Sequence, residues 1–521
     1  MLFRSIGSLL TGWGLGVGAV ICGLIGIQRI TDVYPTSRPR VVALVVYAAG
    51  PVVPAVLGAG DIEALSVYAV LPWIVHLARR FAGIVAADVS TVEGDLVDGV
   101  LAVEPAQRRR LVSAIVLISA TGGSMAPVVI PVAVVTLVIL AVSSWLMRSD
   151  LVVVTRFFTA AGAAALSYVL LLPSSLGWRW SALNGGELAG VVAENARYAA
   201  TFGGGSGVGL LGAALLVPLA AAILITRAWR LTWAVRGASL VLVSMVLLVL
   251  AGRGVATAFL PTASVLSVVM LFGATFPAAG IAGGFGSDVL DRSFGWRQPL
   301  ALVAHISIVL GVVPGVLSVG AGDWNAAEYP ISSVVASQFP SNPATGPYRV
   351  LWVGDPRVLP IRGHQFEPGV AFAITDSGGL EIGDSFPRAE GDVAGTVREA
   401  LSSLASGSTS RVGRLLGPLG IRFIAVPVAD GVASTLDDPI APPVGLTEVL
   451  AAQLDVGVVQ SPPTLEVFVN RSWIPPAAFL TGGAEVASRN AGIESLLLAD
   501  LDGISSVALT GEDGEIGRAH V

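Results

Sequence analysis

The sequence predicts a polytopic α-helical membrane protein of about ten spans, followed by a C-terminal extracytoplasmic α/β domain. Hydrophobic residues make up 54% of the 521-residue chain and charged residues only 13%, whereas soluble domains carry about 25% charged residues. The charge is also divided, because residues 1–319 hold 19 Arg and 13 Asp or Glu, while residues 320–521 hold 11 Arg and 23 Asp or Glu. We therefore expect a transmembrane domain over 1–320, an α/β domain over 321–480 and a loosely ordered or truncated tail over 481–521.

Apolar stretches that could cross a bilayer recur through the first domain, and a spanning helix needs about 20 residues. The stretch 111–147 is too long for one span, and Thr121–Ser124 with Pro127 predicts a turn within it. Dividing it gives ten predicted spans: 7–27, 41–59, 64–78, 111–122, 124–147, 152–173, 206–226, 237–252, 262–284 and 299–319.

The arginines orient these spans. Fifteen of the 19 arginines in 1–319 fall at the ends that this threading places on one side, and cytoplasmic loops are the ones enriched in arginine. If 111–147 were a single span, every later loop would change side and the pattern would be lost. The threading predicts a multi-pass plasma-membrane protein with the loop 174–205 and the C-terminal domain outside the cytoplasm.

The C-terminal domain is predicted from strands that alternate with helices. Segments rich in β-branched and aromatic residues predict strands, and amphipathic segments predict helices. The predicted strands are Tyr348–Gly354, Gly369–Thr375, Ile421–Val426 and Thr464–Asn470, and the predicted helices are Val393–Ser406, Arg411–Leu416 and Leu446–Leu454. This alternation predicts a partly parallel sheet.

Candidate catalytic residues are acids in the predicted outer loops. Asp61 and Glu63 lie in the turn between the second and third spans, where a carboxylate can act as a base. Glu187 and Glu194 lie seven residues apart in the loop 174–205 and would share one face of a helix. The alternative for all four is a solvated loop residue.

Candidate substrate-binding residues lie in the same long loop. They are Trp178, Arg179, Trp180 and Arg197, and an arginine there could pair with a lipid-linked phosphate. His76 in the third span, near Arg79, is an ionisable group within the membrane, which favours a function, although packing is the common alternative.

The chain has no sequence motif for a nucleotide-binding or metal-binding site. The sequence has no Walker loop, HExxH or CxxC motif, and Cys22 is its one cysteine. We expect no metal site or cofactor in this chain, the lipid bilayer as a partner, and no nucleic acid. The termini resemble translated sequencing adapters, over Leu2–Ser5 and Glu515–Val521, so we expect an internal fragment of a longer protein.

Three segments resemble one family. Val45–Arg80, Asp291–Gln298 (DRSFGWRQ) and Leu416–Pro427 (LGPLGIRFIAVP) are similar, in the same order, to large actinobacterial membrane glycosyltransferases. In that family a cytoplasmic family 2 glycosyltransferase domain precedes a polytopic membrane region and an outer domain. The resemblance implies that a nucleotide-sugar domain, with a divalent metal at its Asp-x-Asp-type site, would lie upstream of Met1, so it assigns no catalytic residue to this chain.

The expected function is the membrane portion of a bacterial cell-envelope glycosyltransferase that handles a lipid-linked sugar or polymeric cell-wall glycan. One alternative is a polysaccharide or lipid transporter or flippase, although charged residues are nearly absent from the predicted span centres. The other is a non-catalytic envelope assembly or sensor protein with an outer binding domain.

Overall fold

The chain folds into two compact units, Met1–Asn325 and Ala326–Val521. The computed structural model describes residues 2–58, 61–84, 103–147, 149–172, 175, 199–203, 207–253, 260–285 and 295–320 of the first unit. In the second it describes 331–339, 346–376 without 357, 362 and 368, then 392–475 without 430–433, 435 and 437–438, and the strands 485–488 and 507–510.

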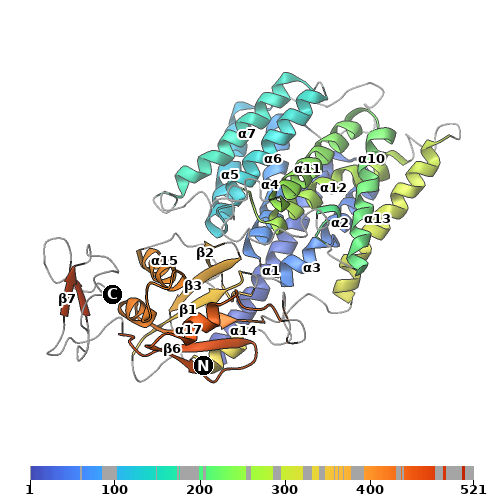
Figure 1. The fold of residues 1–521 in the computed structure, drawn as a ribbon. Helices are drawn as coiled ribbons and strands as arrows, with labels where there is room; N and C mark the ends of the chain where they lie inside the picture. The colour runs from blue at the N-terminus through green and yellow to red at the C-terminus, as the bar shows by residue number, and fades with distance from the viewer. Residues whose placement is uncertain are drawn as a thin grey trace. The chain divides into compact units, whose positions relative to one another are not determined.

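The first unit is a bundle of helices (Figure 1). Its elements are α1 (Leu2–Ile30), η1 (Thr31–Val33), α2 (Ser37–Ala48), α3 (Val52–Gly58), α4 (Ile62–Ala82), α5 (Pro105–Met125), α6 (Val129–Leu146), α7 (Leu151–Leu170), η4 (Gly207–Leu215), α10 (Leu216–Ile225), α11 (Ala228–Gly252), α12 (Ala263–Gly284) and α13 (Arg297–Gly320). Within the described residues, 8 helices are long and apolar enough to cross a membrane, and the bent pair α2–α3 raises this to 9. These helices support a multi-pass membrane protein.

The predicted division of 111–147 is confirmed, since α5 and α6 are separate helices. The helical turns run on through Thr121–Ser124, and the break falls at Ala126–Val128, where Pro127 lies. The count of ten spans depends on α5. Every 18-residue stretch of that helix includes Arg108–Arg110, and this cluster of charge leaves α5 less apolar than the 8 helices above.

Helix α12 lies at the centre of the bundle and contacts α2, α4, α10 and α11. Its most apolar stretch is 94% buried, whereas that of α13 is 44% buried. The exposed side chains of α13 are large and apolar, among them Leu302, Ile306 and Val309. An outer surface of this kind is suited to lipid rather than water.

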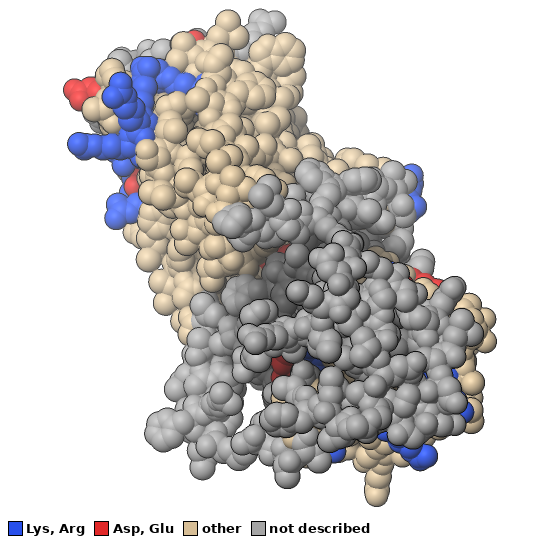
Figure 2. Space-filling model, turned by 90° about the vertical axis from the view of Figure 1, so that its left-hand side faces the viewer, with Lys and Arg blue, Asp and Glu red and all other residues tan. Residues whose placement is uncertain are grey.

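Two contacts join helix ends that the threading places on the same side. At one end, Arg156 at the start of α7 donates to the Ala82 carbonyl at the end of α4 (2.8 Å). At the other, Ser264 at the start of α12 contacts Asp61 at the start of α4. We name these the arginine-rich end and the opposite end. Figure 2 shows basic side chains gathered at one end of the helical unit, with uncharged side chains along the flank beside them.

The second unit contains a six-stranded mixed sheet of order β2-β3-β1-β4-β6-β5 (Figure 1). Its strands are β1 (Arg349–Gly354), β2 (His364–Glu367), β3 (Val370–Asp376), β4 (Ile421–Pro427), β5 (Val456–Val459) and β6 (Leu465–Asn470). The central pair β1–β4 is parallel and the other pairs are antiparallel. The prediction of a partly parallel sheet is therefore confirmed.

Helices cover both faces of this sheet. One face packs under α15 (Asp392–Ala405), α16 (Val412–Leu416) and α17 (Leu446–Ala451), and the other packs under α14 (Ile331–Gln338) through Val335 and Phe339. The sequence did not predict β2, β5 or α14. Within 481–521, predicted to be loosely ordered, the strands β7 (Glu485–Ser488) and β8 (Val507–Thr510) form a parallel pair.

Candidate functional site

The predicted outer acids at the opposite end have structural contacts. Asp61 caps α4, because one carboxylate oxygen accepts from the Ala64 backbone N–H (3.0 Å) and the other accepts from the Ser264 hydroxyl. Glu63 is only 4% exposed and lies in the first turn of α4, where a negative charge is favoured by the helix dipole. Asp61 thus joins α4 to α12, and a catalytic role for either acid stays a prediction.

The remaining predicted site residues lie outside the described part of the chain. These are Trp178, Arg179, Trp180, Glu187, Glu194 and Arg197. Their roles stay predictions.

Two tyrosines of the family-like segment Val45–Arg80 form a reciprocal pair of hydrogen bonds. The Tyr47 hydroxyl donates to the Tyr68 carbonyl (2.7 Å), and the Tyr68 hydroxyl donates to the Tyr47 carbonyl (3.1 Å). Each of these carbonyls precedes a proline by four residues, Pro51 after Tyr47 and Pro72 after Tyr68. Because proline has no N–H, each carbonyl lacks its helical donor, and the other tyrosine supplies one.

This tyrosine pair is buried and stacked. Tyr47 is 0% exposed and Tyr68 is 2% exposed, with ring centroids 4.2 Å apart and planes 13° apart. It joins α4 to the end of α2, where the chain bends by 43° into α3. The tyrosine and proline positions of this segment therefore hold helices together, and nothing about them requires a substrate.

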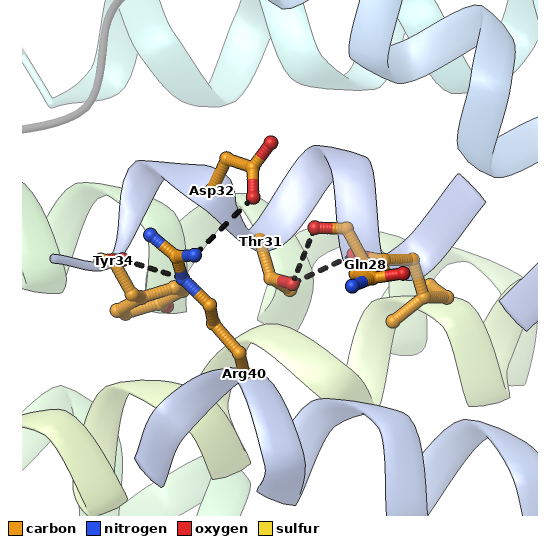
Figure 3. Close-up of polar contacts among 6 residues, drawn as sticks. Gln28, Thr31, Asp32, Tyr34 and Arg40 are labelled. Carbon is orange, nitrogen blue, oxygen red and sulfur yellow. Dashed lines mark hydrogen bonds and ion pairs between the residues drawn. The ribbon is translucent and has the colours of Figure 1, made fainter. Parts of the chain in front are cut away.

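The loop after α1 is held by Arg40 (Figure 3). Its Nε donates to the Tyr34 carbonyl (2.8 Å), and its Nη1 lies 3.5 Å from the Asp32 carboxylate. The Thr31 hydroxyl turns back to the Ile27 carbonyl (2.7 Å) and the Gln28 carbonyl (3.2 Å). Asp32 is thereby fixed at the arginine-rich end.

The Tyr34 side chain anchors the same loop to the bundle. Its hydroxyl donates to the Phe276 carbonyl of α12 (3.3 Å), and its ring lies 5.3 Å from that of Trp229. Burial raises the pKa of the Tyr34 hydroxyl, and the neighbouring Arg230 offsets this only in part. Tyr34 is therefore a neutral hydrogen-bond donor at physiological pH.

His76 and Arg79 face this loop from the last turns of α4. Arg79 is 4% exposed, and its Nη1 donates to the Ile84 carbonyl (3.3 Å). His76 is 7% exposed and lies close to the backbone of Arg29. Arg79 Nε and His76 Nδ1 are buried without a hydrogen-bond partner, and both side chains interact electrostatically with Asp32.

These residues form one site, which we name the arginine-end site and which consists of Arg29, Asp32, Arg40, His76, Arg79 and Arg80. It contains four arginines and a single carboxylate. Arg29 and Arg80 are exposed, Arg40 is partly exposed, and Arg79 and His76 are buried. An excess of guanidinium groups around buried donors is an arrangement that binds phosphate or carboxylate groups.

The sequence predicted part of this site. His76 was singled out as an ionisable group within a span, and Asp32 was missed because only the arginines of its loop were considered. Its neighbours on α4 are distant in sequence, but the local pattern of a lone acid followed by Arg38 and Arg40 was available as a signal.

A second buried cation lies in α11. Arg236, predicted to lie before a span, is 0% exposed because α11 begins at Ala228. Its Nε donates to the Ser144 hydroxyl (3.0 Å), and its guanidinium carbon lies 4.9 Å from the Trp233 ring centre and 5.6 Å from that of Phe157. Burial on all sides fits a role in joining α11 to α6 and α7.

No family model, curated protein or solved structure matches the chain. Among the residues that the structure describes, no group of three or more His, Cys, Asp and Glu side chains is placed to hold a metal ion.

Proposed function

We propose that this chain is the membrane portion of a cell-envelope glycosyltransferase and that it holds a lipid-linked glycan substrate. The observation that carries the proposal is the arginine-end site, where Asp32 pairs with Arg40 and interacts with Arg79, and further arginines lie nearby at the ends of apolar helices. Lipid-linked glycans carry phosphate groups at the membrane surface, and such a site is suited to them.

The resemblance of three segments adds the reaction class. Two of these segments form structural parts of the two units: Val45–Arg80 contains the tyrosine pair, and Leu416–Pro427 contains η8 (Gly417–Leu419) and β4. In the proposed arrangement ten spans cross the plasma membrane. The arginine-rich end then faces the cytoplasm, and the sheet-containing unit follows α13 on the outer side.

The experiment that tests this function identifies what the chain binds in a bacterial envelope. The full chain is purified in lipid nanodiscs, and its co-purified lipids are extracted and analysed by mass spectrometry. We expect a polyprenyl-linked sugar or a lipid-linked glycan. Recovery of phospholipids alone, at the proportions of the surrounding membrane, would argue against the proposal.

A transporter or flippase is the second candidate, and the break between α2 and α3 is the observation that favours it. Discontinuous helices often line transport sites. Proteoliposomes that contain the chain and a fluorescent lipid-linked glycan separate the two functions. A flippase exposes the label on both leaflets without any other component, whereas a glycosyltransferase portion leaves it on one leaflet.

A further inference from the structure

We propose that the arginine-end site binds a phosphate group at the membrane surface and that Asp32 occupies the position of that phosphate until it binds. The inference deepens the proposed function and rests on it only for the identity of the lipid. The phosphate of a lipid headgroup is the expected ligand. A soluble phosphate ester shares its chemistry and is distinguished by the experiment below.

The donors of this site point to an anion larger than one carboxylate. Arg79 Nε is a buried N–H donor without a hydrogen-bond partner, and the buried Nδ1 of His76 beside it has none either. A buried donor is costly to leave unsatisfied. Both side chains interact electrostatically with Asp32, but Asp32 Oδ1 lies 3.5 Å from Arg40 Nη1, a long ion pair. A phosphate carries up to two charges and more acceptor oxygens than a carboxylate.

The surroundings of the site make it accessible from the membrane surface. Arg29 lies in the last turn of α1, and Arg80 follows the buried Arg79 in α4, so exposed and buried arginines are neighbours here. The Asp32 side chain is 39% exposed and that of Arg40 is 35% exposed. A headgroup can therefore approach past the exposed arginines and displace a carboxylate that water already reaches.

The proposal makes opposite predictions for the acid and for the arginines. Asp32→Asn removes the competing charge and strengthens phosphate binding, by about tenfold if its displacement costs about 1.4 kcal/mol. Arg79→Gln and Arg80→Gln remove phosphate donors and weaken binding, by roughly fivefold or more, as expected for a charge-assisted hydrogen bond.

Matched controls come from the same end of the bundle. Asp150→Asn removes an exposed acid at the start of α7, where Asn can replace its cap to the Val152 N–H. Arg109→Gln removes an exposed arginine of α5. These changes alter the net charge equally but lie outside the site, so we expect less than about a twofold change, the size of a surface effect.

The measurement uses the full chain in phosphatidylcholine nanodiscs. A short-chain polyprenyl monophosphate is titrated, and bound lipid is counted by native mass spectrometry, with inorganic phosphate as a competitor in a second series. We expect Asp32→Asn to tighten binding, Arg80→Gln to weaken it and the controls to leave it unchanged, with weak competition by inorganic phosphate.

Several results would overturn the proposal. Equal effects of Asp32→Asn and Asp150→Asn would mean that only net charge matters. Full competition by inorganic phosphate at equal concentration would mean that the ligand is a soluble phosphate and not a lipid headgroup. If Arg79→Gln fails to fold, the binding measured for Asp32→Asn and Arg80→Gln is enough to test the proposal. Variant-dependent phosphate binding without any co-purified glycan would refute the proposed function and leave this inference standing.

Discussion

The tyrosine pair allows a sharp test of the membrane unit. Tyr47→Phe removes the hydroxyl that donates to the Tyr68 carbonyl (2.7 Å), and that carbonyl has no helical donor because Pro72 lies four residues later. A buried acceptor left unsatisfied costs about 1–3 kcal/mol in proteins, and hydrogen bonds between membrane helices average about 0.6 with a maximum near 1.7 kcal/mol. We expect a loss of about 1–2 kcal/mol in the free energy of unfolding.

Proline replacement gives this prediction its control. Pro72→Ala restores an N–H opposite the Tyr68 carbonyl, so Tyr47→Phe should cost close to nothing in that background. The same Pro72→Ala should not rescue Tyr68→Phe, because the Tyr68 hydroxyl donates instead to the Tyr47 carbonyl. Reversible unfolding of the three single and two double variants in detergent measures the coupling energy. Equal rescue of both tyrosine variants, or a neutral Tyr47→Phe, would refute the reasoning.

Two further predictions concern glycines at close contacts, each with a permissive control. Gly23→Ala should weaken the packing of α1 on α4 by about 1–3 kcal/mol, since the new Cβ would lie 2.6 Å from the Tyr68 ring. The control is Gly18→Ala, whose new Cβ would have no atom within 4 Å. Thermal unfolding should show this control to be neutral or stabilising. Gly417→Ala should destabilise the sheet unit, since its Cβ would lie 2.2 Å from a backbone oxygen. Gly395→Ala in α15 should stabilise that unit by about 0.5–1 kcal/mol, and limited proteolysis of the full chain would report both; the reverse order of susceptibility would contradict the packing.

Much of the architecture could be predicted because its signals are local. The turn in 111–147 was predicted from a proline and from the side of the membrane on which each arginine would lie. The structure divides that stretch near Pro127. The central strands β1 and β4 were predicted from β-branched and aromatic residues. The edge strands β2 and β5 are four residues each and were missed, since short edge strands have little pattern of their own.

The two most informative polar arrangements depend on non-local contacts, and this is why the sequence did not predict the tyrosine pair and predicted only His76 of the arginine-end site. The spacing of four between Tyr47 and Pro51 recurs between Tyr68 and Pro72, but its meaning depends on α2 and α4 lying side by side. The same holds for Asp32, which is separated from Arg79 by α2, α3 and most of α4. A single sequence shows which carbonyls are orphaned and which charges exist, but not which residues meet them.

Burial separates the arginines that the predicted orientation alone can explain from those that call for a further reason. Exposed arginines such as Arg109 and Arg110 belong to the first group, because a charge near the surface keeps its hydration. Arg79, at 4% exposed, gives up most of that hydration and still has an unpartnered Nε. Asp32 offsets one charge but is shared with Arg40. If Arg79 were only structural, its replacement by Met would be tolerated or stabilising, as for many buried ion pairs. Loss of phosphate binding in a stable Arg79→Met protein would instead mean that its charge is retained for a ligand.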